Sequence, residues 1–283
     1  LIVAHNMAAL YPAYKLAEMH NCKFAFDVED YHPWESIGSD AINEEKRRKF
    51  LFKKLLPKAV YVSSASPLIA KEVSHLTGLD NVLLVNNTFP KNEFTFVPQT
   101  SEKLKCVWYS QNISAKRGLE LVLPELYKFK DKIEIDLIGK LNQDFFESFL
   151  EKYDDFLNIY GPVNSKELHA RICEYDVGLA IDVNSADRNR EIALTNKIIT
   201  YAQAGLYIFA TDTPAQVNFL ELNKELGSYA GQDATSMNKM IRDVLKNMNE
   251  IRKNKKHRFN QAAAMSWEHE SGKWVERIKE VII

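Results

Sequence analysis

The sequence predicts an α/β protein built from two doubly wound parallel-sheet domains. Short apolar segments alternate with helical segments of about 10 to 15 residues, which is the pattern of parallel βαβ units. The alternation stops between residues 88 and 103 and then begins again. The chain has 283 residues, of which 46% are hydrophobic and 27% charged, and this suits a globular protein of one large or two medium domains.

The first series of elements ends before residue 88. Strands are expected at residues 1–4, 23–28, 59–63 and 82–85, and helices at 8–19, 42–56 and 66–76. Gly78 follows the third helix as a stop signal. Because an apolar strand occupies the first residues, we expect the first domain to lack the initial strands of its fold, so that its N-terminal part is incomplete.

The second series begins after a linker that holds Pro90 and Pro98 and has no helical period. Strands are expected at 104–109, 133–138, 157–160, 177–181, 206–210 and 227–230. Helices are expected at 118–129, 143–153, 165–174, 196–204 and 215–222, with a helical tail over 234–283. The predicted domains are therefore residues 1–90 and 91–265, followed by a last helix over 266–283.

Composition and charge exclude several classes of protein. The formal net charge is −1, so no overall field attracts nucleic acid, and we expect no nucleic-acid partner. The three cysteines, Cys22, Cys106 and Cys173, are scattered and are expected to be reduced thiols of a cytoplasmic protein. No apolar run approaches the roughly 20 residues of a membrane span.

The helix expected over 42–56 carries a basic face, continued to Lys58, beside apolar side chains. The basic stretch 46–58 could contact anionic lipid, which would make the protein membrane-associated on the cytoplasmic face. The alternative is an ordinary solvated helix face.

Residues 190–214 are the most informative stretch. A polar loop leads into a helix that starts with Asn196 and Lys197, stops at Gly205, and is followed by an apolar strand. Such a loop lies where open α/β sheets bind ligands. A helix N-terminus also favours anions, because its first amides lack intrahelical partners. With Lys197 and Arg190 adding positive charge, the stretch predicts a phosphate site.

A second basic loop follows the strand expected at 104–109. Lys116, Arg117 and Gly118 suit a diphosphate, because glycine permits close backbone approach and the cations pair with phosphate oxygens. The loop has one glycine and therefore lacks the dinucleotide fingerprint G-x-G-x-x-G. A solvated loop is the alternative. Gly139 ends the next strand. It could contact a ligand there, or it could simply form a turn.

Two further residues could serve a reacting centre. His5 follows the first strand, where it could hydrogen-bond a substrate or move a proton. The alternative is a buried histidine whose ring is hydrogen-bonded within the protein. Glu191 could accept sugar hydroxyls or could simply be solvated. The polar cluster over residues 27–32 has no spacing typical of metal ligands, so we expect no metal site.

Eight short motifs, taken in order, resemble those of the family-4 (group 1) glycosyltransferases, which have the GT-B fold of two Rossmann-like domains facing across a cleft. They cover nearly the whole chain: His5-Asn6, residues 26–30, Val62-Ser63, residues 85–90, 110–120, 176–180 and 196–205, and Ser266-Trp267-Glu268. In this family the last motif opens a helix that crosses back to the first domain.

The resemblance implies transfer of a sugar from a nucleotide-sugar donor to a saccharide or lipid-linked acceptor, with retention and without metal or cofactor. Cell-surface polysaccharide synthesis is the expected setting. The second domain would hold the donor. By the same resemblance, the donor diphosphate would be bound by Asn112, Arg117, Asn196 and Lys197. The nucleotide and its ribose would meet Gly139 and Thr200. His5 and Glu191 would be the catalytic groups beside the sugar.

The chain also departs from the family pattern. Thr200 stands where the second glutamate of the E-x7-E motif normally binds ribose, and Asn112 replaces the common arginine. An alternative is therefore a catalytically weakened GT-B scaffold that binds a glycan or a partner enzyme. A third is a GT-B enzyme of another class, such as a phosphorylase or an epimerase.

Overall fold

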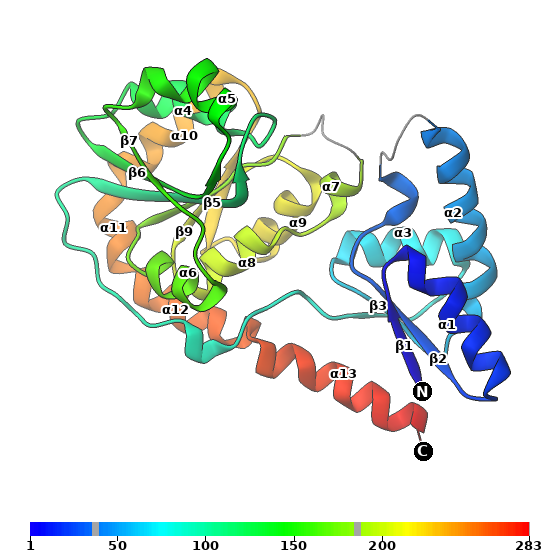
Figure 1. Cartoon of the computed structure of the whole chain (residues 1–283). Helices are drawn as coiled ribbons and strands as arrows, with labels where there is room; N and C mark the ends of the chain where they lie inside the picture. The colour runs from blue at the N-terminus through cyan, green and yellow to red at the C-terminus, as the bar shows by residue number, and fades with distance from the viewer. Residues whose placement is uncertain (36–39, 184–187, 283) are drawn as a thin grey trace. The chain divides into compact units, whose positions relative to one another are not determined.

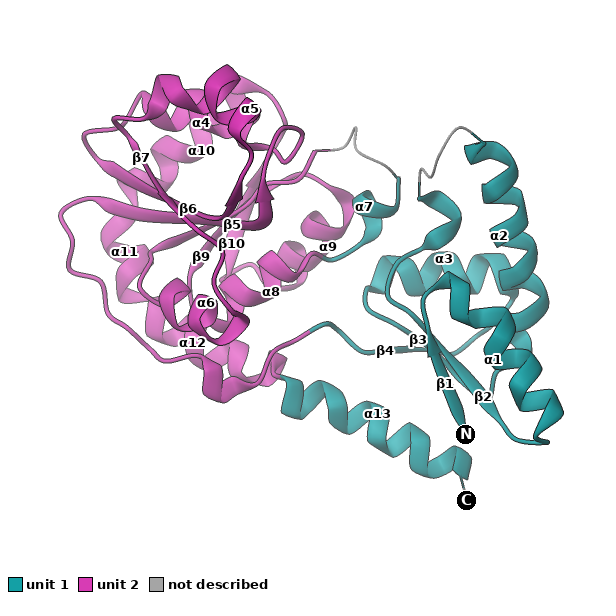
Figure 2. Cartoon of the chain, viewed as in Figure 1, with its two compact units in different colours: residues 1–87, 184–194, 267–283 teal, residues 88–183, 195–266 magenta. Residues whose placement is uncertain are grey.

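The computed structural model describes residues 1–35, 40–183 and 188–282 of the chain. The chain divides into two compact α/β units (Figure 2). Unit 1 consists of Leu1–Asn87, Asn184–Leu194 and Trp267–Ile283. Unit 2 consists of Thr88–Val183 and Thr195–Ser266. Both sheets are parallel, so the predicted fold class is confirmed.

Unit 1 is built on a sheet in the order β1-β2-β3-β4. Figure 1 labels β1, β2 and β3 of this sheet. Its strands are β1 (Ile2–His5), β2 (Phe24–Val28), β3 (Val62–Ser64) and β4 (Val82–Leu84). Its first three helices are α1 (Met7–Met19), α2 (Ala41–Leu55) and α3 (Pro67–Thr77). Phe24, Phe26 and Val28 of β2 are buried in the core of this unit, which explains their apolar character.

Two segments distant in sequence complete unit 1. One holds the short helix α7 (Arg188–Ile192), in which Asn189 accepts a hydrogen bond from the Tyr31 amide at 2.7 Å. The other is α13 (Trp267–Ile282), in which the Trp274 indole donates to the Tyr61 hydroxyl at 2.7 Å. From the sequence, residues 91–265 are expected to form one domain. The structure instead groups residues 188–194 with unit 1, where Ile192 joins the core.

Unit 2 has a six-stranded sheet in the order β10-β9-β8-β5-β6-β7. Numbered along the chain, this is the 3-2-1-4-5-6 order of a dinucleotide-binding fold, in which the direction of winding reverses between β5 and β8. The strands are β5 (Leu104–Ile113), β6 (Ile133–Leu141), β7 (Leu157–Tyr160), β8 (Val177–Ala180), β9 (Tyr207–Thr211) and β10 (Gly227–Ala230).

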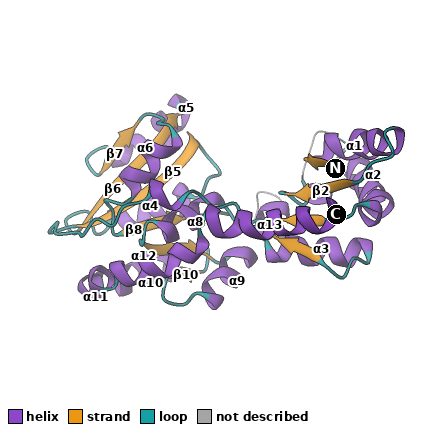
Figure 3. Cartoon of the chain, turned by 90° about the horizontal axis from the view of Figure 1, so that it is seen from below, coloured by secondary structure: helices purple, strands orange, loops and turns teal. Residues whose placement is uncertain are grey.

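The helices of unit 2 pack around these strands (Figure 3). They are α4 (Leu119–Tyr127), α5 (Gln143–Phe145), α6 (Ser165–Ile172), α8 (Asn196–Gln203), α9 (Pro214–Leu222), α10 (Ala234–Lys246), α11 (Met248–Lys253) and α12 (Lys255–Ala262). The predicted helical tail is interrupted at Asn247 and Asn254, which lie between α10, α11 and α12. Within the described ranges, no helix combines the length and apolar character needed to cross a membrane.

Candidate functional site

The loop after β5 approaches the end of β8 closely. Gly118, which precedes α4, has a φ of +91°, a region that side chains rarely adopt. A Cβ atom at Gly118 would collide with the side chain of Ile181 and would lie 3.0 Å from its carbonyl oxygen. Only glycine therefore fits, and the close approach holds the neighbouring Arg117 at the point where the strand order reverses.

The N-terminus of α8 supplies a second electropositive element. Thr195 precedes the helix without a side-chain capping bond, so the first amides of α8 have no side-chain partner there. The Lys197 ammonium lies 3.7 Å from a carboxylate oxygen of Asp182 and 5.6 Å from the centre of the Trp108 ring. Positive charge beside a helix start that no side chain caps favours an anion.

Asp182, the second residue after β8, connects this site to β9 and α9. Its carboxylate accepts a hydrogen bond from the Gln216 amide at 2.8 Å, and its backbone is bonded to the Thr211 hydroxyl in both directions. The Asp182 side chain is only 18% exposed. A fixed negative charge thus neutralises part of the charge on Lys197 in the absence of a ligand.

Replacing Asp182 by asparagine is expected to strengthen binding of a nucleoside diphosphate. Even with the screening of bulk water, removing one like charge about 4 Å from an anion is worth about 1 kcal/mol, or about fivefold in Kd. Titration calorimetry with UDP measures the change. Asp136→Asn is the matched control, because Asp136 is 14% exposed and lies 3.9 Å from Arg171, but at another place on the sheet. Weaker binding by Asp182→Asn would show instead that Asp182 holds Lys197 in its working position.

All four residues predicted for the diphosphate lie at this edge of the unit 2 sheet. Asn112 lies near the end of β5, in the continuation of the strand beyond an irregularity after Tyr109, and is exposed. Arg117 is half-buried in the loop before α4, and Asn196 is exposed at the start of α8. Within the described chain, the side chains of Asn112 and Arg117 have no ion-pair or hydrogen-bond partner, so both are free to meet a ligand.

The two residues predicted for the nucleotide and ribose have structural tasks. Gly139 lies within β6, and a Cβ atom there would collide with the carbonyl group of Ser110. Thr200 is fully buried, and its hydroxyl donates to the Asn196 carbonyl and bonds the Tyr109 hydroxyl, both at 2.8 Å. The ribose role of Thr200 stays a prediction, and this burial argues against it. Burial also raises the pKa of Tyr109, so its hydroxyl stays protonated.

In unit 1, His5 lies at the carboxyl end of β1 with its side chain 44% exposed. Its Nδ1 atom is 3.1 Å from Asp27 Oδ2 and 4.0 Å from Glu29 Oε1. The three side chains offer ligand atoms within 4.8 Å of one another, a spacing that a metal ion could also use. The expected metal independence stays a prediction.

Glu191, the other predicted catalytic residue, is half-buried on α7 and belongs to unit 1, whereas Lys197 belongs to unit 2. The residues predicted as one donor-binding stretch are thus divided between the two units. On α7 the neighbouring Arg188 guanidinium stacks on Trp34, with its central carbon 3.9 Å from the ring centre.

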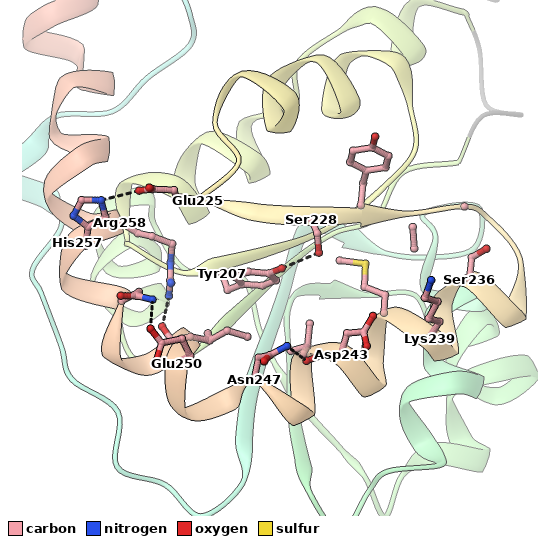
Figure 4. A pocket seen from close by; sticks show the side chains of 17 residues that line it. Tyr207, Glu225, Ser228, Ser236, Lys239, Asp243, Asn247, Glu250, His257 and Arg258 are labelled. Carbon is pink, nitrogen blue, oxygen red and sulfur yellow. Dashed lines mark hydrogen bonds and ion pairs between the residues drawn. The ribbon is translucent and has the colours of Figure 1, made fainter.

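A cavity of about 900 Å³ lies between β10 and the helices α10, α11 and α12, and the described residues that line it include none of the predicted site residues (Figure 4). Lys239 and Asp243 project into it from α10, and the Glu225–His257 pair, 2.7 Å apart, lies at its margin. Arg258 in its wall is buried and donates to the Gly205 carbonyl at 3.1 Å, and burial lowers its pKa to about 10. These partners give Arg258 a structural role in the wall.

Solved structures similar to this chain are glycosyltransferases. Sucrose-phosphate synthase from Thermosynechococcus elongatus is 15% identical with a TM-score of 0.78, over 99% of this chain and 73% of that chain. Anabaena HepE in complex with UDP is 10% identical with a TM-score of 0.75, over 99% and 79%. S. aureus TarM in complex with UDP and other ligands is 10% identical with a TM-score of 0.71, over 97% and 55%.

The chain has the GT-B fold. At these identities the likeness establishes the fold alone, and the GT-B resemblance expected from the motifs is confirmed to that extent. No protein-family model and no curated protein sequence matches the chain. Within this GT-B fold, Asp182 is a site residue that was not predicted from the sequence. Asp182 directly follows the apolar strand expected at 177–181. A polar residue at the carboxyl end of a strand is also the feature by which His5 was predicted.

Proposed function

We propose that the protein is a glycosyltransferase that moves a sugar from a nucleotide-sugar donor to a saccharide or lipid-linked acceptor. One observation carries the proposal: Lys197 and the start of α8, which has no side-chain cap, lie at the carboxyl edge of a dinucleotide-type sheet. Arg117, which has no side-chain partner among the described residues, lies at the same edge. The GT-B structures bound to UDP and to UDP-glucose support a uridine diphosphate sugar as donor.

In the proposed reaction, unit 2 binds the donor diphosphate. As the bond between the sugar and the diphosphate breaks, negative charge grows on the leaving phosphate. Arg117, Lys197 and the amides of α8 stabilise that charge, and such preorganised groups act most strongly on the transition state. His5 and Glu191 in unit 1 are proposed to serve the transferred sugar. We also propose retention of configuration, independence of metal, and a role in cell-surface polysaccharide synthesis in the cytoplasm.

Contact with the cytoplasmic membrane face through residues 46–58 is a further part of the proposal. Several charges of this stretch already have partners. Arg48 is buried against the His32 carbonyl, Arg47 pairs with Glu44, and Lys49 pairs with Glu45. The contact would therefore depend on the other lysines of the stretch, with Phe50 exposed beside them.

The test is titration calorimetry of the full chain with UDP, GDP, UDP-glucose and GDP-mannose, followed by a transfer assay with the donor that binds. We expect a uridine nucleotide to bind and its sugar to be released or transferred without added metal. Nucleotide binding without hydrolysis or transfer to any saccharide acceptor would favour the catalytically weakened scaffold. No nucleotide binding at all would overturn the proposal.

A further inference from the structure

Three polar side chains form a row across the sheet of unit 1. In the parallel register, His5 of β1 is paired with Asp27 of β2, and Asp27 is paired with Ser63 of β3. Paired residues of neighbouring strands project from the same face of a sheet, so their side chains meet. The row lies at the carboxyl ends of these strands, where α/β sheets bind ligands.

Hydrogen bonds join the three side chains. The Ser63 hydroxyl donates to Asp27 Oδ1 at 2.5 Å, and His5 Nδ1 lies 3.1 Å from Asp27 Oδ2. Because a carboxylate oxygen accepts hydrogen bonds, Nδ1 of His5 carries the proton of this bond. In the neutral ring the other nitrogen, Nε2, then holds a free lone pair.

An aromatic contact restricts the His5 ring further. Trp274 of α13 meets it edge to face, with ring centres 5.9 Å apart and planes at 87°. The Trp274 indole is itself held by its bond to the Tyr61 hydroxyl. The ring of His5 is therefore fixed by Asp27 at one nitrogen and by Trp274 at a ring surface, although the side chain stays 44% exposed.

We propose that Asp27 is a positioning residue that, held by Ser63, keeps His5 in the Nδ1–H tautomer with Nε2 ready to accept a hydrogen bond from a hydroxyl of the sugar or the acceptor. The identity of that hydroxyl-bearing ligand rests on the proposed glycosyltransferase function. The tautomer itself does not, because it follows from the hydrogen bonds within unit 1.

A shared cation is the competing explanation for the same cluster. Glu29 would have to join as a ligand, and the 4.0 Å between its Oε1 atom and His5 Nδ1 would permit that, although Glu29 makes no hydrogen bond to the row among the described residues. A cation would also have to displace the proton between His5 and Asp27. The observed contacts are those of a hydrogen-bonded row, so they favour the positioning role.

The tautomer can be read by NMR of the full chain labelled with ¹⁵N-histidine, with His5→Gln identifying the His5 signals. We expect the Nδ1–H form in the wild type. In Asp27→Asn the amide oxygen faces the Ser63 hydroxyl and the amide nitrogen donates to Nδ1, so the ring changes to Nε2–H. Glu29→Gln is the control, because it removes a nearby carboxylate that is not hydrogen-bonded to His5. We expect it to leave the tautomer unchanged.

Two results would overturn the proposal. One is an Nε2–H ring in the wild type, or an Nδ1–H ring that persists in both Asp27→Asn and Asp27→Ala. The other is tight binding of added Zn²⁺ that Asp27→Ala and Glu29→Gln both abolish, because it would assign the cluster to a cation.

Kinetics link the tautomer to the reaction. Asp27→Asn is expected to lower kcat for transfer by about 100-fold, the lower end of what a positioned proton-handling group contributes, with little change in the donor KM. UDP affinity should stay at the wild-type value, since the residues proposed to bind it belong to unit 2. An unchanged kcat would overturn the positioning role. If the wild type transfers no sugar, the proposed function fails while the tautomer result still stands.

Discussion

Replacing Lys197 by alanine is expected to lower kcat for sugar transfer by about 100-fold to 1,000-fold. Removing one preorganised group that stabilises developing negative charge typically costs about 3 to 4 kcal/mol of transition-state stabilisation. Lys197 is suited to this task because its side chain is only 12% exposed and its ammonium lies at the start of α8. Because the side chain is mostly buried, solvent screens its charge only weakly, and its attraction for a bound diphosphate stays strong.

The measurement is steady-state kinetics with the donor identified by calorimetry. Lys239→Ala is the control, because it removes a lysine that lines the cavity beside α10 instead. It should leave both kcat and KM near the wild-type values. If Lys197→Ala keeps its kcat and only raises the donor KM, then Lys197 contributes to ground-state binding alone, and the leaving-group role proposed for it is wrong.

Replacing Gly118 by alanine is expected to cost about 2 to 5 kcal/mol in the free energy of unfolding. Two penalties combine: about 1 to 2 kcal/mol for a left-handed backbone conformation, and about 1 to 3 kcal/mol for overpacking against a buried side chain. The buried side chain is that of Ile181, at the end of β8. Because relief requires the loop to move away from β8, Arg117 should move with it and UDP affinity should fall as well.

Urea unfolding followed by circular dichroism, together with UDP titration, measures both effects. Gly78→Ala separates the two penalties, since Gly78 has a φ of +76° but an added Cβ would meet no atom of the described residues within 4 Å. It should lose only the backbone part of the stability and no UDP affinity. Equal losses for the two variants would mean that close packing between Gly118 and Ile181 is unimportant.

The fold was largely predictable because its signals are local. Apolar runs such as 24–28 and 206–210 are buried strands of parallel sheets, and glycine stops such as Gly78 end helices where expected. Strand ends were less predictable. β5 and β6 run to Ile113 and Leu141, several polar residues beyond the predicted ends, because pairing with each other continues after the irregularity near Tyr109.

Pairings between distant segments could not be read from the sequence. α7 packs in unit 1 through the bonds of Asn189, although its chain neighbours lie in unit 2. Thr200 was assigned to the place of a ribose ligand by resemblance to the family motif, yet its hydroxyl already bonds the Asn196 carbonyl and the Tyr109 hydroxyl. Local spacing places a residue on a helix, but packing against other strands decides which side of the helix meets a ligand.

The sequence by itself determined the two parallel α/β units and predicted a phosphate site at the Asn196-Lys197 helix start, because periodicity, glycine stops and helix starts are local properties. Only the tertiary structure decided that Asp182 faces Lys197, that Asp27 and Ser63 hold His5, and that Gly118 must be glycine. These contacts depend on strand order and register, which bring together residues far apart in the chain.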